Sequence, residues 1–252
     1  MDRKAVKVPF TPDHTPDWMC PTCAKGILRI KDESFSKAEL ASSRDHSYDE
    51  WEPYWIRYVY SCLLECSNSK CKEVVTSTGT GGVDASMGQD ERGEWYETYE
   101  DYFEPKYFEP PLHLFRTPAE CPESVAGPIK ESFRLLLASP DAAANAVRAA
   151  VEQLLTELKI KRYTSSNGKR RFISLHQRIA LLPGQYAEIR DLILAIKWIG
   201  NIGSHSRNEL TVDDVLDAYE FLEHVLEEIY GQKTRKLKSL AKKINRKGGP
   251  IK

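Results

Sequence analysis

The second half of the chain is organised around nine residues that end an apolar segment: Lys197-Trp198-Ile199-Gly200-Asn201-Ile202-Gly203-Ser204-His205. Upstream of them, apolar residues recur at the spacing of a helix. Asn201 and His205 are four residues apart and share a face if the helix continues through them. Gly200 and Gly203 leave room beside these side chains for a neighbouring backbone or a ligand. Glycine and asparagine are also ordinary helix-stop signals, so a plain helix end is the alternative.

Helix-start patterns frame this stretch and predict an all-α bundle over residues 118–231. Ser139-Pro140-Asp141 combines an N-cap serine, a proline at the first helical position and an early acid. Two capping boxes follow, Ser174 with Gln177 and Thr211 with Asp214. The segment from Tyr163 to Arg171 is polar and basic, and it is predicted to be a loop between helices.

The composition is that of a globular protein, with 252 residues, 41% of them hydrophobic and 29% charged. This length accommodates two modules. No apolar run approaches the ~20 residues of a membrane helix, and Met1 to Phe10 lacks the apolar centre of a secretory signal. We therefore expect a cytoplasmic protein without a membrane partner.

Charge is strongly segregated along the chain. The segment from Asp84 to Glu109 holds nine acidic residues against two basic ones, whereas Gly231 to Lys252 holds nine Lys or Arg and no acid. The basic end is predicted to meet a polyanion, although a solubilising disordered end is the alternative. The candidate polyanion-binding residues are Lys233, Arg235, Lys236, Lys238, Lys242, Lys243, Arg246 and Lys247.

Five of the six cysteines lie in the first 71 residues, which in a cytoplasmic protein favours metal binding over disulfides. The candidate ligands form a C-x2-C and a C-x4-C pair, Cys20 with Cys23 and Cys66 with Cys71. Strand-like segments flank the second pair, so the pattern predicts a small β zinc ribbon with one structural Zn²⁺. Gly26 is expected to provide the tight turn of the first knuckle. Cys62, on the same strand face as Cys66, remains an alternative ligand.

A segment of different character joins the two halves. Gly79 to Gly82 is expected to be a flexible connector, and the aromatic residues that follow alternate with acids up to Phe108. This part is predicted to be an extended strap that packs its rings onto a neighbouring surface. The expected fold is thus α+β, with a zinc-ribbon-like module at 1–80, an acidic-aromatic connector at 81–117, the helical bundle at 118–231 and a basic tail at 232–252.

Three segments of the helical half, taken in order, carry a resemblance to a known family: Ala146 to Leu154, Ile199 to His205 and Asp214 to Tyr230. They resemble the domain-of-unknown-function family DUF4145, a member of the HEPN-like superfamily. The N-terminal cysteine module is also similar to what full-length members often carry, which extends the resemblance over nearly the whole chain. The resemblance implies that the C-terminal bundle is HEPN-like.

HEPN-like domains are often dimers, and they often act on RNA or serve toxin, restriction and phage-defence systems. Active members use an Arg and a His with four to six residues between them, in a composite site across the dimer. Counting back from His205, apolar residues and a glycine stand where that Arg would be, and Lys197 lies one residue too early. Lysine lacks the bidentate fork of arginine, although Arg148 on a neighbouring helix can supply one. The candidate catalytic set is therefore His205, Asn201, Lys197 and Arg148.

The expected function is that of a non-catalytic, zinc-containing binding module. We expect a homodimer that docks on nucleic acid, RNA or DNA, or on a partner protein, in a bacterial defence or restriction-type system. In this interpretation four side chains form a structural network: Arg148, Glu152, Asn201 and His205. The alternative is a HEPN-like, metal-independent endoribonuclease in which His205 acts as general acid or base. A generic scaffold without either activity is a third interpretation.

Overall fold

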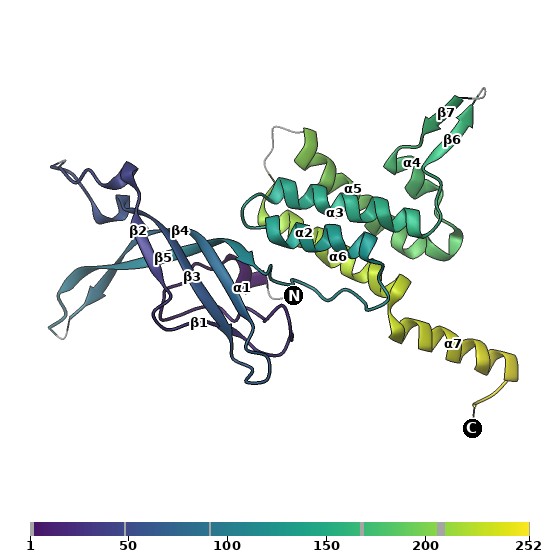
Figure 1. Cartoon of the computed structure of the whole chain (residues 1–252), viewed down its shortest axis with the longest axis horizontal. Coiled ribbons are helices and arrows are strands. Elements are labelled where there is room, and N and C mark those ends of the chain that lie inside the picture. Colours follow the sequence, from purple (N-terminus) through teal and green to yellow (C-terminus); the bar gives the residue numbers. More distant parts are fainter. Residues whose placement is uncertain (1–2, 48, 91, 167–168, 206–209, 252) are drawn as a thin grey trace. The chain divides into compact units, whose positions relative to one another are not determined.

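The computed structural model of the protein describes residues 3–47, 49–90, 92–166, 169–205 and 210–251. The chain divides into two compact units, Met1–His113 and Leu114–Lys252. The first is built around a curled antiparallel sheet and the second around helices, which confirms the predicted α+β class (Figure 1). The boundary between the units falls inside the predicted connector.

The first unit contains five strands in one antiparallel sheet. Its elements are α1 (Arg3–Lys7), β1 (Leu28–Ile30), β2 (Ser36–Glu39), η1 (Ala41–Ser43), η2 (Pro53–Trp55), β3 (Arg57–Cys66), β4 (Val74–Gln89) and β5 (Trp95–Glu109). The order is β1-β3-β4-β5, and β2 pairs with the other half of β3 along the edge that β1 occupies. The two strands predicted around the second cysteine pair are therefore β3 and the beginning of β4.

The prediction of a flexible connector at Gly79–Gly82 is wrong, because these residues lie inside β4. Their missing side chains make room for aromatic rings. A Cβ on Gly82 would lie 2.9 Å from Tyr102 Oη of β5, and one on Gly79 would lie 2.9 Å from the ring of Tyr60. Glycine-rich β4 and aromatic-rich β5 thus pair from Thr76 and Glu109 out to Gln89 and Trp95, with rings covering glycines across the strands. The predicted strap is one strand of a long hairpin.

An aromatic core holds the cysteine-bearing loops of the first unit in place. Phe10 is the centre: its ring lies 5.3 Å from both Trp18 and Tyr60 and 5.8 Å from Phe103. Trp18 is buried, its ring lies 5.1 Å from Phe108, and its indole donates a hydrogen bond to the Ala5 carbonyl. Offset and edge-on contacts between rings stabilise such a core beyond the area they bury. The first cysteine pair begins two residues after Trp18.

The second unit contains the predicted helices. They are α2 (Glu123–Leu135), α3 (Pro140–Glu157), α4 (Leu175–Ala180), α5 (Ala187–His205), α6 (Val212–Tyr230) and α7 (Gln232–Lys247), with the short turn η3 (Gly184–Tyr186) before α5. The start signals are confirmed: Ser139 accepts a hydrogen bond from the Ala142 amide, and both predicted capping boxes form. Gly231 ends α6, also as predicted.

The loop predicted at Tyr163–Arg171 is instead a small hairpin of β6 (Tyr163–Ser166) and β7 (Lys169–Phe172). The two residues between the strands are Asn167 and Gly168, the strongest short-range signal for a two-residue hairpin. The polar composition of the segment indicated a loop, but the turn signal at these two residues is the one that the structure follows. On the hairpin, the Arg170 guanidinium lies 3.6 Å from the centre of the Tyr163 ring.

Helix α5 continues through Gly200 to His205, so the plain helix end considered above is excluded. Gly200 serves as a close-packing position: a Cβ there would lie 2.7 Å from Arg148 Cβ and 3.1 Å from the Ala144 carbonyl oxygen of α3. The absence of a side chain lets α3 and α5 approach each other. No helix within the described residues has both the length and the apolar character that a membrane span requires.

Candidate metal centre and a basic pair in the helical unit

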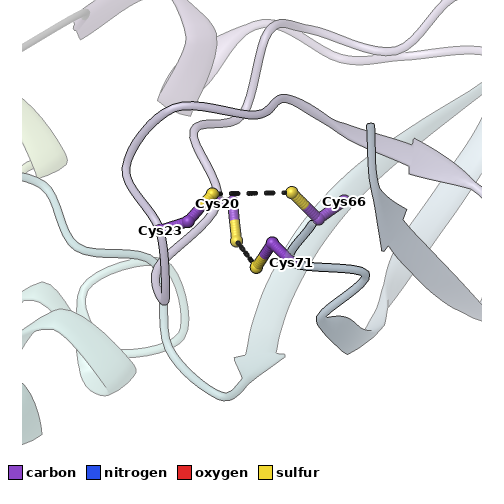
Figure 2. A group of neighbouring side chains, drawn as sticks. All are labelled: Cys20, Cys23, Cys66 and Cys71. Atoms are coloured by element: carbon purple, nitrogen blue, oxygen red, sulfur yellow. Dashed lines mark hydrogen bonds between the residues drawn. The ribbon is translucent and has the colours of Figure 1, made fainter. Parts of the chain in front are cut away.

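The structure brings the four predicted cysteines together (Figure 2). All four sulfurs lie within 4.8 Å of one another, with Cys23 Sγ 3.7 Å from Cys66 Sγ and Cys20 Sγ 3.9 Å from Cys71 Sγ. Cys20 and Cys66 are buried, whereas Cys23 and Cys71 are partly exposed. At these separations, one ion at the centre can contact all four sulfurs.

Two similar loops carry the ligands. The first runs from Cys20 to Gly26 and is closed by the Cys20 amide, which donates to the Gly26 carbonyl at 2.9 Å. The second runs from Cys66, at the end of β3, to the beginning of β4, and the Cys66 amide donates to the Glu73 carbonyl at 2.9 Å. In both loops the residue after the second cysteine has a left-handed backbone: Ala24 has φ +49° and Lys72 has φ +55°.

Gly26 has a different role from the one expected. The left-handed turn of the first loop is at Ala24, and Gly26 provides space. A Cβ on Gly26 would lie 2.4 Å from Cys66 Sγ and 2.9 Å from the Asn68 amide nitrogen. Real Cβ atoms do not come this close to a sulfur, so a side chain at residue 26 would push the two loops apart.

Backbone and side-chain N–H groups point at the sulfurs. The amide of Gly26 donates to Cys23 Sγ at 3.4 Å, and the amide of Asn68 donates to Cys66 Sγ at 3.4 Å. The hydrogen bond from Gly26 is the main reason that the pKa of Cys23 falls to about 6. Burial instead raises the pKa of Cys66 to about 12. A bound cation would remove this conflict, because it stabilises every thiolate at once.

Asn68 is a residue of the cysteine site that the spacing of the cysteines does not identify. Its side-chain Nδ2 lies 3.6 Å from Cys23 Sγ of the other loop, in addition to its amide contact with Cys66. An asparagine two residues after a candidate ligand, in a turn between two cysteines, is the signal that would have identified it.

The remaining two cysteines lie outside the four-sulfur cluster. Cys62 is buried on β3, and burial raises the pKa of its thiol to about 11. Cys121 is half-buried in the second unit, and burial raises its pKa to about 11 as well. Neither thiol is activated. The geometry therefore favours Cys66 over Cys62 as the ligand on β3.

In the second unit, α3 and α5 bring two cations together. Arg148 Nη2 lies 3.3 Å from Glu152 Oε1, so the predicted pair forms, yet the buried Nε of Arg148 has no hydrogen-bond partner within the described structure. Lys197 is 8% exposed, and its ammonium lies over the Trp198 ring. Burial and then the charge of Arg148 lower the pKa of Lys197. The result is a basic pair, in which Lys197 is buried and Arg148 is partly exposed.

The rest of the predicted network is less complete. Asn201 is half-buried on α5, and within the described residues it makes no hydrogen bond to Arg148 or Glu152. The side chain of His205 lies outside the described part of the structure. Convergence of all four side chains therefore stays a prediction, and so does the catalytic set.

The basic tail is helical. Within α7, the side chains of Lys236, Lys242, Lys243, Arg246 and Lys247 are exposed. The side chains of Lys233, Arg235 and Lys238 lie outside the described structure. One helix therefore presents at least five of the eight predicted cations to solvent.

Fold and site define a two-unit α+β protein whose sheet unit carries a four-thiol cluster that can hold a metal ion. Residues 130–247, in the helical unit, match the domain of unknown function DUF4145, as the resemblance suggested. Residues 8–108 match a different one, DUF8608, so the resemblance to DUF4145 does not extend to the N-terminal unit. No curated protein and no solved structure matches the chain.

Proposed function

We propose that the protein is a non-catalytic, zinc-containing binding module that docks on nucleic acid through the basic helix α7. The observation that carries this proposal is α7 itself. It is a helix of 16 residues without an acid, and it belongs to the segment that DUF4145 matches. The resemblance to HEPN-like proteins, many of which serve defence systems and dimerise, favours a similar setting for this chain.

Zinc is the metal that suits the four-thiol cluster best. Thiolates at about 2.3 Å from a tetrahedral zinc are about 3.8 Å apart, and the two closest sulfur pairs here lie 3.7 Å and 3.9 Å apart. Four protein ligands leave no position for water or substrate, so the ion would be structural. The N-terminal unit would then be a zinc-ribbon-like module in which metal binding stabilises the fold.

Nucleic acid suits α7 because its cations are many, exposed and unmixed with acids. A protein that neutralises phosphates with Lys or Arg releases condensed counterions, and its affinity falls steeply with salt. A helix of 16 residues is about 24 Å long and can follow several phosphates along a groove or a single strand. This contact is independent of base sequence, so a binding experiment must determine whether the protein prefers RNA or DNA.

The test measures binding of the full chain to a single-stranded RNA and a duplex DNA by fluorescence anisotropy, over a range of salt concentrations. A variant with Gln at Lys236, Lys242, Lys243, Arg246 and Lys247 should bind more weakly, and its salt slope should fall by about 0.7–0.9 per lost contact. The control replaces three exposed cations of the sheet unit, Lys25, Lys31 and Lys70, with Gln, and the slopes are compared per charge removed. An unchanged slope in the α7 variant would remove α7 from the mechanism.

A HEPN-like ribonuclease is the second candidate function, and the basic pair of Arg148 and Lys197 favours it. The unpartnered Nε of Arg148 beside Lys197 can receive a phosphate oxygen, and α5 extends to His205. In this function His205 would transfer the proton. His205→Ala and Asn201→Ala should then abolish RNA cleavage and leave stability nearly intact. A structural network predicts no cleavage and a loss of roughly 1–3 kcal/mol from stranded polar partners.

A further inference from the structure

The outer part of the β4–β5 hairpin is a two-stranded ribbon. Pairing between β3 and β4 ends at Arg57 and Gly82, whereas β4 and β5 remain paired out to Gln89 and Trp95. Within the described residues, no third strand pairs with this outer part. The ribbon, residues 83–89 and 95–101, therefore extends beyond the three-stranded part of the sheet (Figure 1), and apart from Val83 its residues are exposed or half-buried.

One side of the ribbon carries large apolar groups. Residues directly opposite each other in an antiparallel pair share a face, and on this side Met87 faces Glu97, Gln89 faces Trp95 and Ala85 faces Tyr99. We call these six residues the ribbon face. Trp95 is 67% exposed, and Met87 and Tyr99 are exposed as well. Large apolar groups gathered on one exposed face, away from the core, mark an interaction surface.

The ribbon face is also negatively charged. Tyr99 Oη donates a 2.7 Å hydrogen bond to Glu97 Oε2. This bond, with the charges of Glu97 and Glu52 nearby, raises the pKa of Tyr99 to about 12. Tyr54, two residues after Glu52, is a further exposed ring near Tyr99. Rings beside carboxylates suit a partner that presents aliphatic and cationic groups together.

Helix α7 has this combination. Leu237, Leu240 and Ile244 recur at i, i+3 and i+7 and form one exposed apolar stripe. At 100° per residue, Lys236 and Lys243 lie together along one side of the stripe. Phosphates would pair with the lysines but leave the stripe in water, so nucleic-acid binding does not account for it. A second α7 cannot cover it either, because two such cationic helices repel each other.

We propose that α7 of one copy of this chain docks its apolar stripe on the ribbon face of a second copy. The lengths are compatible, since the stripe from Leu237 to Ile244 extends about 11 Å along the helix and the ribbon face from Ala85 to Gln89 about 14 Å along the strand. The aromatic rings cover the leucines and isoleucine, and the carboxylates of Glu52 and Glu97 face the flanking lysines. A reciprocal exchange between two copies closes a two-fold dimer. This contact goes beyond the proposed function and competes with nucleic acid for the same cations.

The test measures self-association of the full chain by sedimentation at roughly 0.1 M and roughly 1 M salt, between which the screening length falls from about 10 Å to about 3 Å. The facing variants are Lys236→Glu/Lys243→Glu on α7 and Glu52→Lys/Glu97→Lys at the ribbon face, where Glu97 belongs to β5 and Glu52 precedes η2. Each has a matched control with the same charge change on the opposite face of α7 or of the ribbon. These are Lys242→Glu/Arg246→Glu and Asp84→Lys/Glu100→Lys. Thermal melting checks that all variants fold.

The proposal expects a dimer that dissociates at high salt. Each facing variant should raise the dissociation constant about tenfold or more, the controls should stay close to wild type, and the four facing changes combined should restore the dimer. A chain that is monomeric at every concentration overturns the proposal, as does a dimer insensitive to the facing changes. It is also overturned if the α7 variants lose only oligonucleotide binding. The proposed function is contradicted by a different result, namely an unchanged salt dependence of oligonucleotide binding in the α7 variant with five Gln substitutions.

Discussion

The two units of this protein are stabilised over very different distances along the chain. In the sheet unit, the closest sulfur contacts join residues 43 and 51 positions apart, and glycines of β4 lie under rings of other strands. In the helical unit, α3, α4 and α6 begin with caps that span three residues. Because its stabilising contacts join residues far apart in sequence, the first unit depends on a few of them. The second unit distributes its stability over many local contacts.

The strongest test of this difference removes one metal ligand. Cys66→Ser should unfold the sheet unit and leave the helical unit folded, because metal binding and folding are coupled in small four-cysteine modules. Far-UV circular dichroism should keep its helical signal while limited proteolysis cuts within residues 1–113. The matched control is Cys121→Ser, which removes a half-buried thiol outside the cluster. If the helical signal disappears together with the sheet, the two units are not independent.

A smaller effect is expected within the first cysteine loop, where two substitutions of opposite sense can be compared. Gly26→Ala should lower metal affinity more than tenfold, because its Cβ would lie 2.4 Å from Cys66 Sγ. Ala24→Gly should stabilise the same loop by up to about 1 kcal/mol, since glycine adopts the left-handed backbone of residue 24 without strain.

Competition for zinc against a chromophoric chelator measures both variants of the loop. Each variant serves as the control for the other, because one adds a methyl group and the other removes one, at positions two residues apart. Equal affinities for the two variants would mean that neither the close approach at Gly26 nor the backbone of Ala24 matters to the ligand geometry.

The same contrast explains how much the sequence could predict. The cysteine pairs, the Ser139 cap and both capping boxes were predicted, since each depends on residue types a few positions apart. The pairing of Gly79–Gly82 with aromatic β5 was not, because ring-over-glycine packing depends on a partner about twenty residues away. The space at Gly26 was missed for the same reason, as its neighbour Cys66 is distant in sequence. The ribbon face needs the register of β4 and β5, which no local pattern provides.

The next effect in size concerns the packing of α3 against α5. Gly200→Ala should destabilise the helical unit by about 1–3 kcal/mol, because the added Cβ would lie 2.7 Å from Arg148 Cβ and 3.1 Å from a backbone oxygen of α3. Gly184→Ala is the control, since an added Cβ there meets no atom within 4 Å. Urea unfolding followed by the helical signal separates the two. A stable Gly200→Ala variant would show that α3 and α5 can move apart at little cost.

The smallest effect is expected at the start of α6, and it has a pH dependence that marks its origin. The Thr211 hydroxyl and amide both donate hydrogen bonds to Asp214, at 2.6 Å and 2.8 Å, and they lower the pKa of its carboxyl. A group whose pKa is lower in the folded state stabilises the fold above its ordinary pKa, and this contribution is lost as the pH falls through the lowered value. Asp214→Asn should therefore cost about 0.5–1 kcal/mol at neutral pH, and the difference from wild type should shrink in acid.

The measurement is the urea midpoint of the helical signal for both proteins at neutral pH and at a pH below 3.8, the ordinary pKa of the group. Asp213→Asn is the matched control on the same helical turn, because Asp213 is exposed and is not the acid of the capping box. Both substitutions remove one negative charge near the helix N-terminus, so they share the loss of favourable interaction with the helix dipole. The excess cost of Asp214→Asn over Asp213→Asn isolates the capping box. If that excess does not decrease in acid, the carboxylate of Asp214 contributes to stability through something other than its bonds to Thr211.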